Sequence, residues 1–362
     1  TETITTMRPS KAFIDLDALR HNLSVAARHA PGSRNLAVIK ANAYGHGMEE
    51  AARALGPHAD ALAVATIDEA VSLRDAGIGD PLLVLQGVTA RGDFTEAAAQ
   101  KLWLMVHEER QLQTLLDHDG PPLGIWLKVD TGMHRLGFAP ADVAGACARL
   151  KASPAVDQTP VLCTHLACAD DLDSPVTEQQ LDAFSGCSGD HALPLSIANS
   201  AGIMHWPGTR ADWNRPGIML YGSEPTGAYV GKSELQAVMT VTSEIMAIRD
   251  IGPGEGVGYG HRWKAGAASR IGTVSLGYGD GYPRHAPSGT PVLVNGKRAP
   301  LVGTVSMDMI TVDLSGHEEA RVGDPVEAWG KNLPVNEVAW HAGTIGYELL
   351  AGLSARLPRI YR

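Results

Sequence analysis

Short apolar segments alternate with amphipathic segments from residue 11 to about residue 225 of this 362-residue chain. Eight apolar segments have the length of buried strands, and they cover residues 36–40, 61–65, 82–85, 102–106, 124–129, 161–165, 193–197 and 213–220. Helix-like segments lie between them, at residues 48–55, 68–76, 108–117, 140–150 and 177–186. Repeated strand–helix units predict a parallel sheet, and eight such units predict closure into a (β/α)8 TIM barrel.

The pattern changes near residues 225–232. Residues 237–249 are rich in β-branched side chains and no helix pattern follows them. Glycine-rich turns then separate short apolar runs at residues 271–276, 291–294, 300–305 and 309–314. The pairs Asn295-Gly296 and Pro253-Gly254 are typical turn signals. The sequence therefore predicts a barrel over residues 1–230, followed by a mostly antiparallel β domain over residues 231–362.

Composition excludes several classes of protein. The formal net charge is −10 and no basic run occurs, which argues against a nucleic-acid or anionic-membrane partner. No apolar stretch approaches the ~20 residues of a membrane span, and the first residues lack the pattern of a signal peptide. The four cysteines, at positions 147, 163, 168 and 187, show no zinc-like spacing. We therefore expect a cytoplasmic protein with reduced thiols and no metal site.

The stretch from Leu36 to Gly47, LAVIKANAYGHG, carries the first chemical signal. Lys40 is placed at the carboxyl end of a buried strand, where partial desolvation lowers the pKa of an amine and frees it for reaction with a carbonyl group. The alternative is a strand-end lysine that extends to water. Asn42, Tyr44 and His46 crowd the same turn, which is more polar functionality than a plain connection needs.

KANAYGHG resembles the pyridoxal-phosphate lysine motif of the alanine racemases. Six further segments resemble motifs of that family and follow in its order, namely VDTGMHRLGF, IANSAG, RPGIMLYG, GVGYG, GYGDGY and VSMDM. Together they extend from residue 40 to beyond residue 308. The resemblance implies a barrel and a β domain, a pyridoxal 5'-phosphate cofactor, and a homodimer that shares its active sites. It also implies interconversion of L-alanine and D-alanine, for peptidoglycan or for alanine catabolism.

The barrel prediction places these motifs at one rim, since catalytic groups of TIM barrels lie at the carboxyl ends of the strands. Lys40 ends the first predicted strand, Arg135 follows the fifth and His165 ends the sixth. The segment SIANSAG follows the seventh strand and offers a hydroxyl and backbone amides at a helix start, a suitable place for phosphate. Taken alone, NSAG is an ordinary helix cap.

The resemblance assigns most of these residues to the cofactor. The implied set is Lys40, Tyr44, His165, Asn199, Ser200, Arg215, Gly217, Ile218 and Tyr347. Within this set, the residues implied to contact the cofactor phosphate are Ser200, Gly217, Ile218, Tyr347 and Tyr44. Arg215 matches the arginine that faces the pyridine nitrogen. An arginine keeps its proton, so it donates to that nitrogen and limits the electron sink. The alternative for Arg215 is a barrel arginine paired with Asp212.

Racemisation needs one acid–base group on each face of a planar carbon. The resemblance implies a two-base mechanism on a pyridoxal-phosphate aldimine, with Lys40 serving D-alanine and Tyr259 of the partner subunit serving L-alanine. Without the resemblance, Tyr259 in GVGYG would be a turn residue. The remaining implied positions are Arg135, Met307 and Asp308 for substrate, Lys128 as a possible carbamylated lysine, and Tyr278, Asp170 and Asp171 at the entrance.

One position departs from the family pattern. Family members commonly carry arginine where this chain has Thr304, near the entrance, and this bears on substrate range. The alternatives are a racemase of serine, lysine or a broader range, a related decarboxylase, and a non-catalytic pyridoxal-phosphate carrier. Decarboxylases place an acidic group at the pyridine nitrogen, and carriers lack the β domain.

Overall fold

The computed structural model describes residues 8–189, 192–228 and 233–362. These residues form two compact units. One unit contains residues 20–43 and 48–220, and the other contains the described residues before 20 together with residues 44–47 and those from 221 onward. The predicted domain division at residue 230 falls within residues 229–232, outside the described part of the chain, and stays a prediction.

The first unit is a closed parallel barrel of eight strands, which confirms the predicted fold. The strands are β2 (Arg34–Val38), β3 (Ala61–Val64), β4 (Leu82–Val84), β5 (Trp103–Val106), β6 (Gly124–Lys128), β7 (Val161–Cys163), β8 (Leu195–Ser196) and β9 (Trp213–Asn214). β9 returns to β2 and closes the barrel through the pairs Arg34–Trp213 and Asn35–Asn214.

Most of the predicted strands were too long. β2 ends at Val38 and β7 at Cys163, so Lys40 and His165 each lie two residues beyond their strand. The last predicted strand, 213–220, is wrong after Asn214, because residues Ile218–Tyr221 form a 3-10 helix, η3. Apolar residues past the strand ends remain buried, as Ile39 does, so hydrophobicity alone does not mark where the hydrogen-bonded ladder stops.

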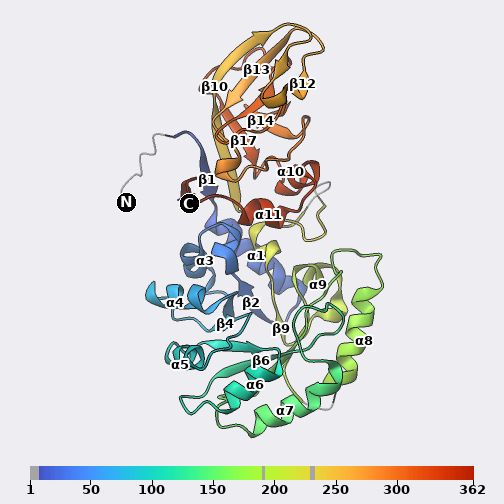
Figure 1. The fold of residues 1–362 in the computed structure, drawn as a ribbon. Coiled ribbons are helices and arrows are strands. Elements are labelled where there is room, and N and C mark those ends of the chain that lie inside the picture. The colour runs from blue at the N-terminus through green and yellow to red at the C-terminus, as the bar shows by residue number, and fades with distance from the viewer. Residues whose placement is uncertain (1–7, 190–191, 229–232) are drawn as a thin grey trace. The chain divides into compact units, whose positions relative to one another are not determined.

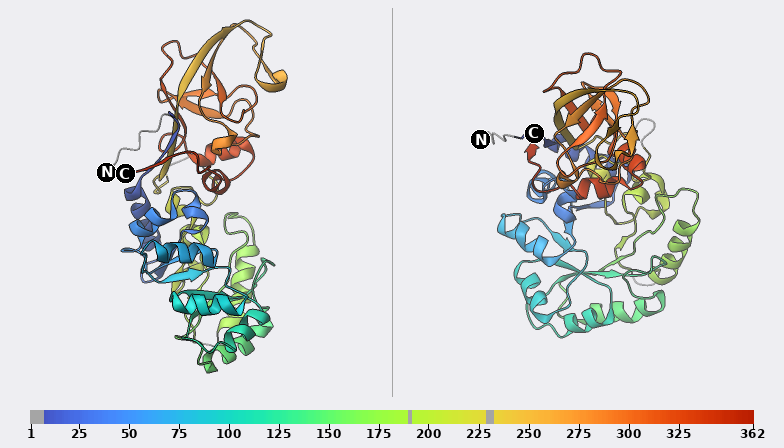
Figure 2. Two further views of the ribbon diagram at one scale, coloured as in Figure 1. Left: turned by 60° about the vertical axis from the view of Figure 1, so that its left-hand side comes forward. Right: turned by 45° about the horizontal axis from the view of Figure 1, so that its top comes forward.

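The helices of this unit lie around the outside of the barrel (Figures 1 and 2). They are α1 (Leu16–His29, which begins in the other unit), α3 (Met48–Leu55), α4 (Ile67–Asp75), α5 (Arg91–Ala99), α6 (Glu109–Leu116), α7 (Val143–Ala152), α8 (Val176–Ser188) and α9 (Ser200–His205), with 3-10 turns η1 (Pro140–Asp142) and η2 (Pro207–Thr209). The short element α2 (Lys40–Tyr44) follows β2 and has left-handed backbone. No helix among the described residues is long and apolar enough to cross a membrane.

The barrel strands are buried on both faces, as parallel strands under helices are, and therefore show no polar alternation. Three tryptophans from β5, β6 and β9 meet. The ring of Trp213 lies 5.9 Å from that of Trp103 and 5.5 Å from that of Trp126, both edge-on. Large aromatic rings at this point fill space that shorter side chains would leave empty.

The second unit is built on an eight-stranded sheet. Its strands are β1 (Lys11–Ile14), β10 (Met239–Ile251), β13 (Ser269–Val274), β14 (Pro291–Val294), β15 (Lys297–Pro300), β16 (Ile310–Asp313), β17 (Pro325–Trp329) and β18 (Arg359–Tyr361). A separate hairpin joins β11 (Gly256–Val257) and β12 (Trp263–Lys264). The remaining elements are η4 (Tyr259–His261), η5 (Tyr278–Asp280), α10 (Val335–Ala342) and α11 (Gly346–Ala351).

The predicted antiparallel β domain is confirmed, with one parallel pair, β1 with β18. The sequence analysis missed β1, which pairs with β10 although more than 200 residues separate them. The predicted turn at Asn295-Gly296 joins β14 to β15, and both residues have positive φ, 50° and 77°. This is the geometry of a two-residue hairpin turn.

Gly45 provides a test of how tightly this unit is packed. Its φ is +82°, and a β-carbon there would overlap the carbonyl oxygen of Leu350. We expect Gly45→Ala to lower the free energy of unfolding by about 2 kcal/mol or more. Gly316→Ala is the control, because Gly316 has no neighbour within 4 Å of such an atom. Equal midpoints for the two variants in urea unfolding would contradict the packing seen at Gly45.

Candidate active site

Lys40 opens an unusual turn. The next four residues, Ala41 to Tyr44, all have φ between 50° and 53°, although none is glycine. Left-handed backbone costs an L-residue roughly 1–2 kcal/mol, so the turn needs strong fixation. The Asn42 side chain accepts a hydrogen bond from the Met48 amide at 2.9 Å, and the Ala43 amide donates to the Ile39 carbonyl at 2.8 Å. α2 is therefore not a right-handed helix, and it holds the lysine at the barrel rim.

A group of basic side chains surrounds the lysine. Burial lowers the pKa of Lys40, and the neighbouring charge of Arg135 lowers it further, while Glu69 opposes both. Lys128, on β6, is nearly buried, and burial lowers the pKa of its amine to about 8, with Arg215, Arg135 and Lys40 acting in the same direction. This cluster of cations suits an anionic ligand.

His165 belongs to the same group but carries no charge at neutral pH. Burial and the nearby cations, Arg215 first, hold the pKa of its imidazole well below its usual value. The Nδ1 atom lies 3.5 Å from a guanidinium nitrogen of Arg215. Because an arginine can only donate, Nδ1 is the accepting nitrogen and the remaining ring proton is on Nε2.

Arg215 is almost fully buried, and none of the partners of its guanidinium among the described residues is a carboxylate. It donates to the Ser196 hydroxyl and to the backbone carbonyls of Thr164 and Ile197. The carboxylate of Asp212 accepts instead from the Leu195 amide at 2.8 Å. The alternative in which Arg215 pairs with Asp212 is therefore wrong for the described residues, and a positive donor remains fixed at the rim.

Arg135 comes from the loop after β6. The carboxylate of Asp130 shapes this loop by accepting from the backbone amides of Gly132 and His134, each at 3.0 Å. These hydrogen bonds hold the pKa of Asp130 below its ordinary value in spite of partial burial. Gly137 has a φ of 137°, and a β-carbon there would overlap the backbone at Asp130. The VDTGMHRLGF motif is thus a rigid loop that presents Arg135 to solvent.

The loops after β8 and at β9 meet at Ser200. Its hydroxyl oxygen accepts from the amide of Gly217 at 2.9 Å and from that of Met219 at 3.3 Å. The Asn199 side chain caps α9 by accepting from the Gly202 amide at 3.0 Å. Ile218 follows in the same buried turn. The structure thus brings together Ser200, Gly217 and Ile218, the three residues of these loops for which the resemblance implies phosphate contact, and places Asn199 beside them.

Two more residues of the predicted phosphate set lie in the other unit. The ring of Tyr44 stacks on Tyr221 at 4.7 Å, and the ring of Tyr347 lies 6.1 Å away. Burial raises the pKa of Tyr44 to about 12, so its hydroxyl stays protonated and can donate a hydrogen bond.

Tyr259 projects from a loop of the second unit, and its side chain is 72% exposed. Glycines flank it, with φ values of 72° at Gly258 and 71° at Gly260, so the GVGYG motif supplies backbone that other residues rarely adopt. The hydroxyl of Thr304 donates to the Tyr259 carbonyl at 3.2 Å. Thr304 therefore contacts the backbone that carries the tyrosine, a contact that the sequence did not indicate.

Met307 and Asp308 lie on a loop held by the GYGDGY motif. The amides of Tyr278 and Gly279 donate to the carbonyls of Ser306 and Met307, at 3.0 and 2.8 Å. Glycine is needed at position 277 because a β-carbon there would overlap these same carbonyl oxygens.

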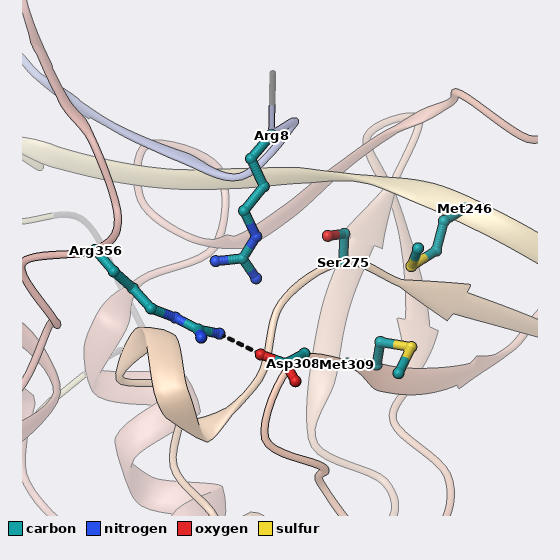
Figure 3. A pocket seen from close by; sticks show the side chains of 6 residues that line it. All are labelled: Arg8, Met246, Ser275, Asp308, Met309 and Arg356. Atoms are coloured by element: carbon teal, nitrogen blue, oxygen red, sulfur yellow. Dashed lines mark hydrogen bonds and ion pairs between the residues drawn. The ribbon is translucent and has the colours of Figure 1, made fainter. Parts of the chain in front are cut away.

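An arginine that no sequence motif indicated fixes Asp308. Arg356 donates to Asp308 at 2.7 Å and to the fully buried Asp280 at 2.8 Å, and Arg8 also pairs with Asp280. Figure 3 shows the Arg356 guanidinium directed at Asp308, in a pocket that Met246 and Met309 also line. No local pattern signals this contact, because 48 residues separate the two partners.

The remaining predictions concern the entrance, metals and thiols. Asp170 and Asp171 are exposed in the loop after β7, and their place at an entrance stays a prediction. All four cysteines are free thiols. Within the described residues, no group of three or more histidines, cysteines or carboxylates is arranged to hold a metal ion.

Comparison with known proteins agrees with this geometry. The alanine racemase N-terminal domain family matches residues 14–225, and the alanine racemase C-terminal domain family matches residues 238–361. The chain belongs to the alanine racemase family. Alanine racemases are pyridoxal-phosphate-dependent isomerases, so this chain is an enzyme of that class with that cofactor.

Individual alanine racemases resemble the chain over nearly its whole length. That of Chromohalobacter salexigens is 48% identical over 98% of both chains, and the catabolic enzyme of Pseudomonas aeruginosa is 47% identical over 98% of this chain and 99% of its own. The crystal structure of the biosynthetic P. aeruginosa enzyme has a TM-score of 0.94 at 47% identity, covering 98% of this chain and all of the other. The Bartonella henselae enzyme, with covalently bound pyridoxal phosphate, has a TM-score of 0.89 at 30% identity, covering 98% and 99%.

Lys128 yields a prediction about pH. Its pKa is about 8 in the fold and 10.5 ordinarily, so between these pH values the unfolded chain binds a proton that the folded chain does not. Stability therefore rises with pH across this window and is lost as pH falls through it. In CO2-free buffer, the free energy of unfolding of the parent minus that of Lys128→Met should rise by roughly 3 kcal/mol from pH 8 to 10.5. A flat difference would mean that Lys128 is not desolvated.

Proposed function

We propose that the chain interconverts L-alanine and D-alanine, with Lys40 and Tyr259 of the partner subunit as the two acid–base groups. The observation that carries the proposal is the Lys40 amine, whose pKa is lowered by burial and by Arg135 at the rim of the barrel. A lowered pKa increases the neutral fraction of the amine, which is the form that can accept a proton. The loop that carries Tyr259 leaves most of that side chain exposed, as a residue donated to another subunit must be.

The residues present fit pyridoxal 5'-phosphate. Lys40 would attach it, and the residues that would hold the phosphate are Ser200, Gly217, Ile218, Tyr44 and Tyr347. Asn199 caps the helix that begins at Ser200 and would complete the cofactor site. The fit rests on the surplus of cations around Lys40 and on the hydroxyl and amides gathered at Ser200. When bound, the cofactor supplies the electron sink that makes the α-proton of the substrate acidic.

Arg215 would hold the pyridine nitrogen as a hydrogen-bond donor, with His165 beside it. An arginine does not transfer its proton, so the electron sink stays limited and transamination is suppressed. The contacts of Arg215 to carbonyls and a hydroxyl, with no carboxylate among its partners in the described residues, support this role over that of a decarboxylase.

The two faces of the substrate carbon need separate groups. Lys40 would remove the α-proton of D-alanine, and Tyr259 of the partner subunit would add a proton to the opposite face to give L-alanine. In the reverse direction, Tyr259 of the partner subunit would remove the α-proton of L-alanine and Lys40 would add a proton to give D-alanine. Arg135, with its side chain exposed at the rim, would bind the substrate carboxylate. Met307 and Asp308 would line the pocket, and Tyr278, Asp170 and Asp171 would form its entrance.

A homodimer follows from the same assignment. Several large apolar side chains of the second unit are exposed, which is typical of a surface covered by another chain, and they include Tyr259, Met307, Met246 and Met309. A second copy would bury them and complete two active sites. The product would supply D-alanine for peptidoglycan or for alanine catabolism, and the relatives include both biosynthetic and catabolic enzymes.

Lys128 would carry a carbamate. Its low pKa leaves much of the amine neutral near pH 8, so the nitrogen can attack CO2 and release one proton to solvent. The carbamate anion would offset the charges of Arg135 and Arg215. In 13C-labelled bicarbonate, NMR should show one slowly exchanging carbamate resonance that is missing in Lys128→Met. The same spectrum for both proteins would exclude the modification.

Hydrogen exchange at the α-carbon tests the two bases. In D2O, Lys40→Ala should lose covalent cofactor attachment and all exchange. Tyr259→Phe should keep the cofactor but lose exchange of L-alanine by about 100-fold or more. NMR with L-alanine, D-alanine, L-serine and L-lysine reads the rate and the substrate range together. Intact exchange of L-alanine in Tyr259→Phe would exclude the tyrosine, and comparable rates for serine or lysine would favour the broader racemase.

Mixing the two variants tests the shared site. In a mixed dimer, one site carries both substitutions and the other carries neither, so random assortment should restore about a quarter of the parent activity. Two inactive variants that stay inactive after subunit exchange would mean that Tyr259 acts within its own chain. A protein that binds the cofactor without any exchange would instead be a carrier.

A further inference from the structure

Glu69 touches the turn that carries Lys40. One carboxylate oxygen, Oε1, accepts from the backbone amide of Ala41 at 2.7 Å. Ala41 directly follows the lysine and is the first of the four left-handed residues. Among the described residues, this is the side-chain contact that fixes the start of the turn, while the Asn42 side chain fixes its end.

The second oxygen of Glu69 anchors the same side chain to the barrel. Oε2 accepts from the amide of Ala65 at 2.7 Å and from that of Thr66 at 3.4 Å, where β3 ends and α4 begins. The amide of Glu69 donates in return to the Thr66 hydroxyl at 3.4 Å, which completes a capping box. One carboxylate thus joins the Lys40 turn to the neighbouring strand, and each of its oxygens is used.

Glu69 also differs in charge from the other groups near Lys40. Arg135 and Lys128 are cations that interact with the lysine, and His165 is neutral. The charge of Glu69 raises the pKa of Lys40 and so opposes the effects of burial and of Arg135. A capping residue for α4 needs no such proximity to the lysine.

We propose that Glu69 is the positioning residue of Lys40, which holds the left-handed turn in place and sets the charge around the amine. The inference takes the catalytic role of Lys40 from the proposed function. The contacts of Glu69 are observed in the structure and do not depend on that function. The simpler alternative is that Glu69 serves only to cap α4.

Amide hydrogen exchange of the full-length holoenzyme tests the positioning. Glu69→Gln keeps the length of the side chain, but its one carbonyl oxygen cannot accept from both sides. We expect peptides covering residues 40–47 to exchange about tenfold faster than in the parent. Thr66→Ala is the matched control, because it breaks the capping box and leaves the carboxylate on Ala41. If the two variants exchange alike at residues 40–47, Glu69 only caps the helix.

A pH profile tests the charge. In the full chain freed of cofactor, the rate at which Lys40 reacts with trinitrobenzenesulfonate, followed by peptide mass spectrometry, reports its protonation. Glu69→Gln should move the midpoint to lower pH, because an anion near the ammonium is lost. Thr66→Ala and Asp68→Asn, which neutralises an exposed carboxylate on the same helix, should leave the midpoint unchanged. An unchanged midpoint in Glu69→Gln would overturn the proposal.

If Glu69→Gln does not fold, Glu69→Asp takes its place in the exchange experiment, since its shorter side chain keeps the charge but cannot span both contacts. A parent enzyme without covalently attached cofactor would refute the proposed function. The reaction of Lys40 with trinitrobenzenesulfonate in the cofactor-free chain would still test the role of Glu69.

Discussion

Closure of the parallel barrel is the constraint on which the candidate site depends. When β9 pairs with β2, the carboxyl ends of all eight strands meet at one rim, and residues far apart in the chain become neighbours. Lys40 follows β2, Lys128 ends β6, His165 follows β7 and Arg215 follows β9. An open sheet with the same strands would leave the first and last of these at opposite edges.

Bringing these groups together has an electrostatic cost. Lys40, Lys128, Arg135 and Arg215 are cations, and burial penalises each charged form that loses water. The structure meets this cost in two ways. Arg215 is satisfied by neutral oxygen atoms, whereas the amines of Lys40 and Lys128 have lowered pKa values. The result is a site in which two amines with lowered pKa values lie beside fixed positive donors, a combination suited to a phosphorylated cofactor and a carboxylate substrate.

The second unit uses a different principle, because its functional residues lie on loops. Gly258 and Gly260 allow the backbone at Tyr259, and Gly277 permits the close approach of the Met307 loop. Charged side chains then hold one of these loops in place. The buried carboxylate of Asp280 accepts from Arg8, from Arg356 and from the Gly277 amide, and these partners keep its pKa below the usual value despite burial. Arg356 extends this support to Asp308.

Much of this arrangement was readable from the sequence. The alternation of short apolar and amphipathic segments predicted the barrel, because the spacing of hydrophobic residues is a local property of the chain. The glycine-rich motifs predicted where the backbone turns. Lys40 was expected at the end of the first strand, Ser200 after the seventh and Arg215 at the eighth. The ends of the strands were less predictable. Residues such as Ile39 stay buried beyond the ladder, so the pattern of hydrophobicity continues where the hydrogen bonds do not.

The contacts that fix the site were decided by tertiary structure. The sequence T-I-D-E at residues 66–69 is typical of a helix N-terminus capped by Glu69. Its carboxylate reaches the Ala41 amide only because β2 pairs with β3 in the barrel. Arg356 and β1 likewise find their partners across long stretches of chain. The sequence by itself determined the fold class, the family and the chemical groups, because these depend on local pattern and residue type. The pairing of charges and the left-handed turn at Lys40 depend on which distant backbone comes within hydrogen-bond distance, and that is set by packing.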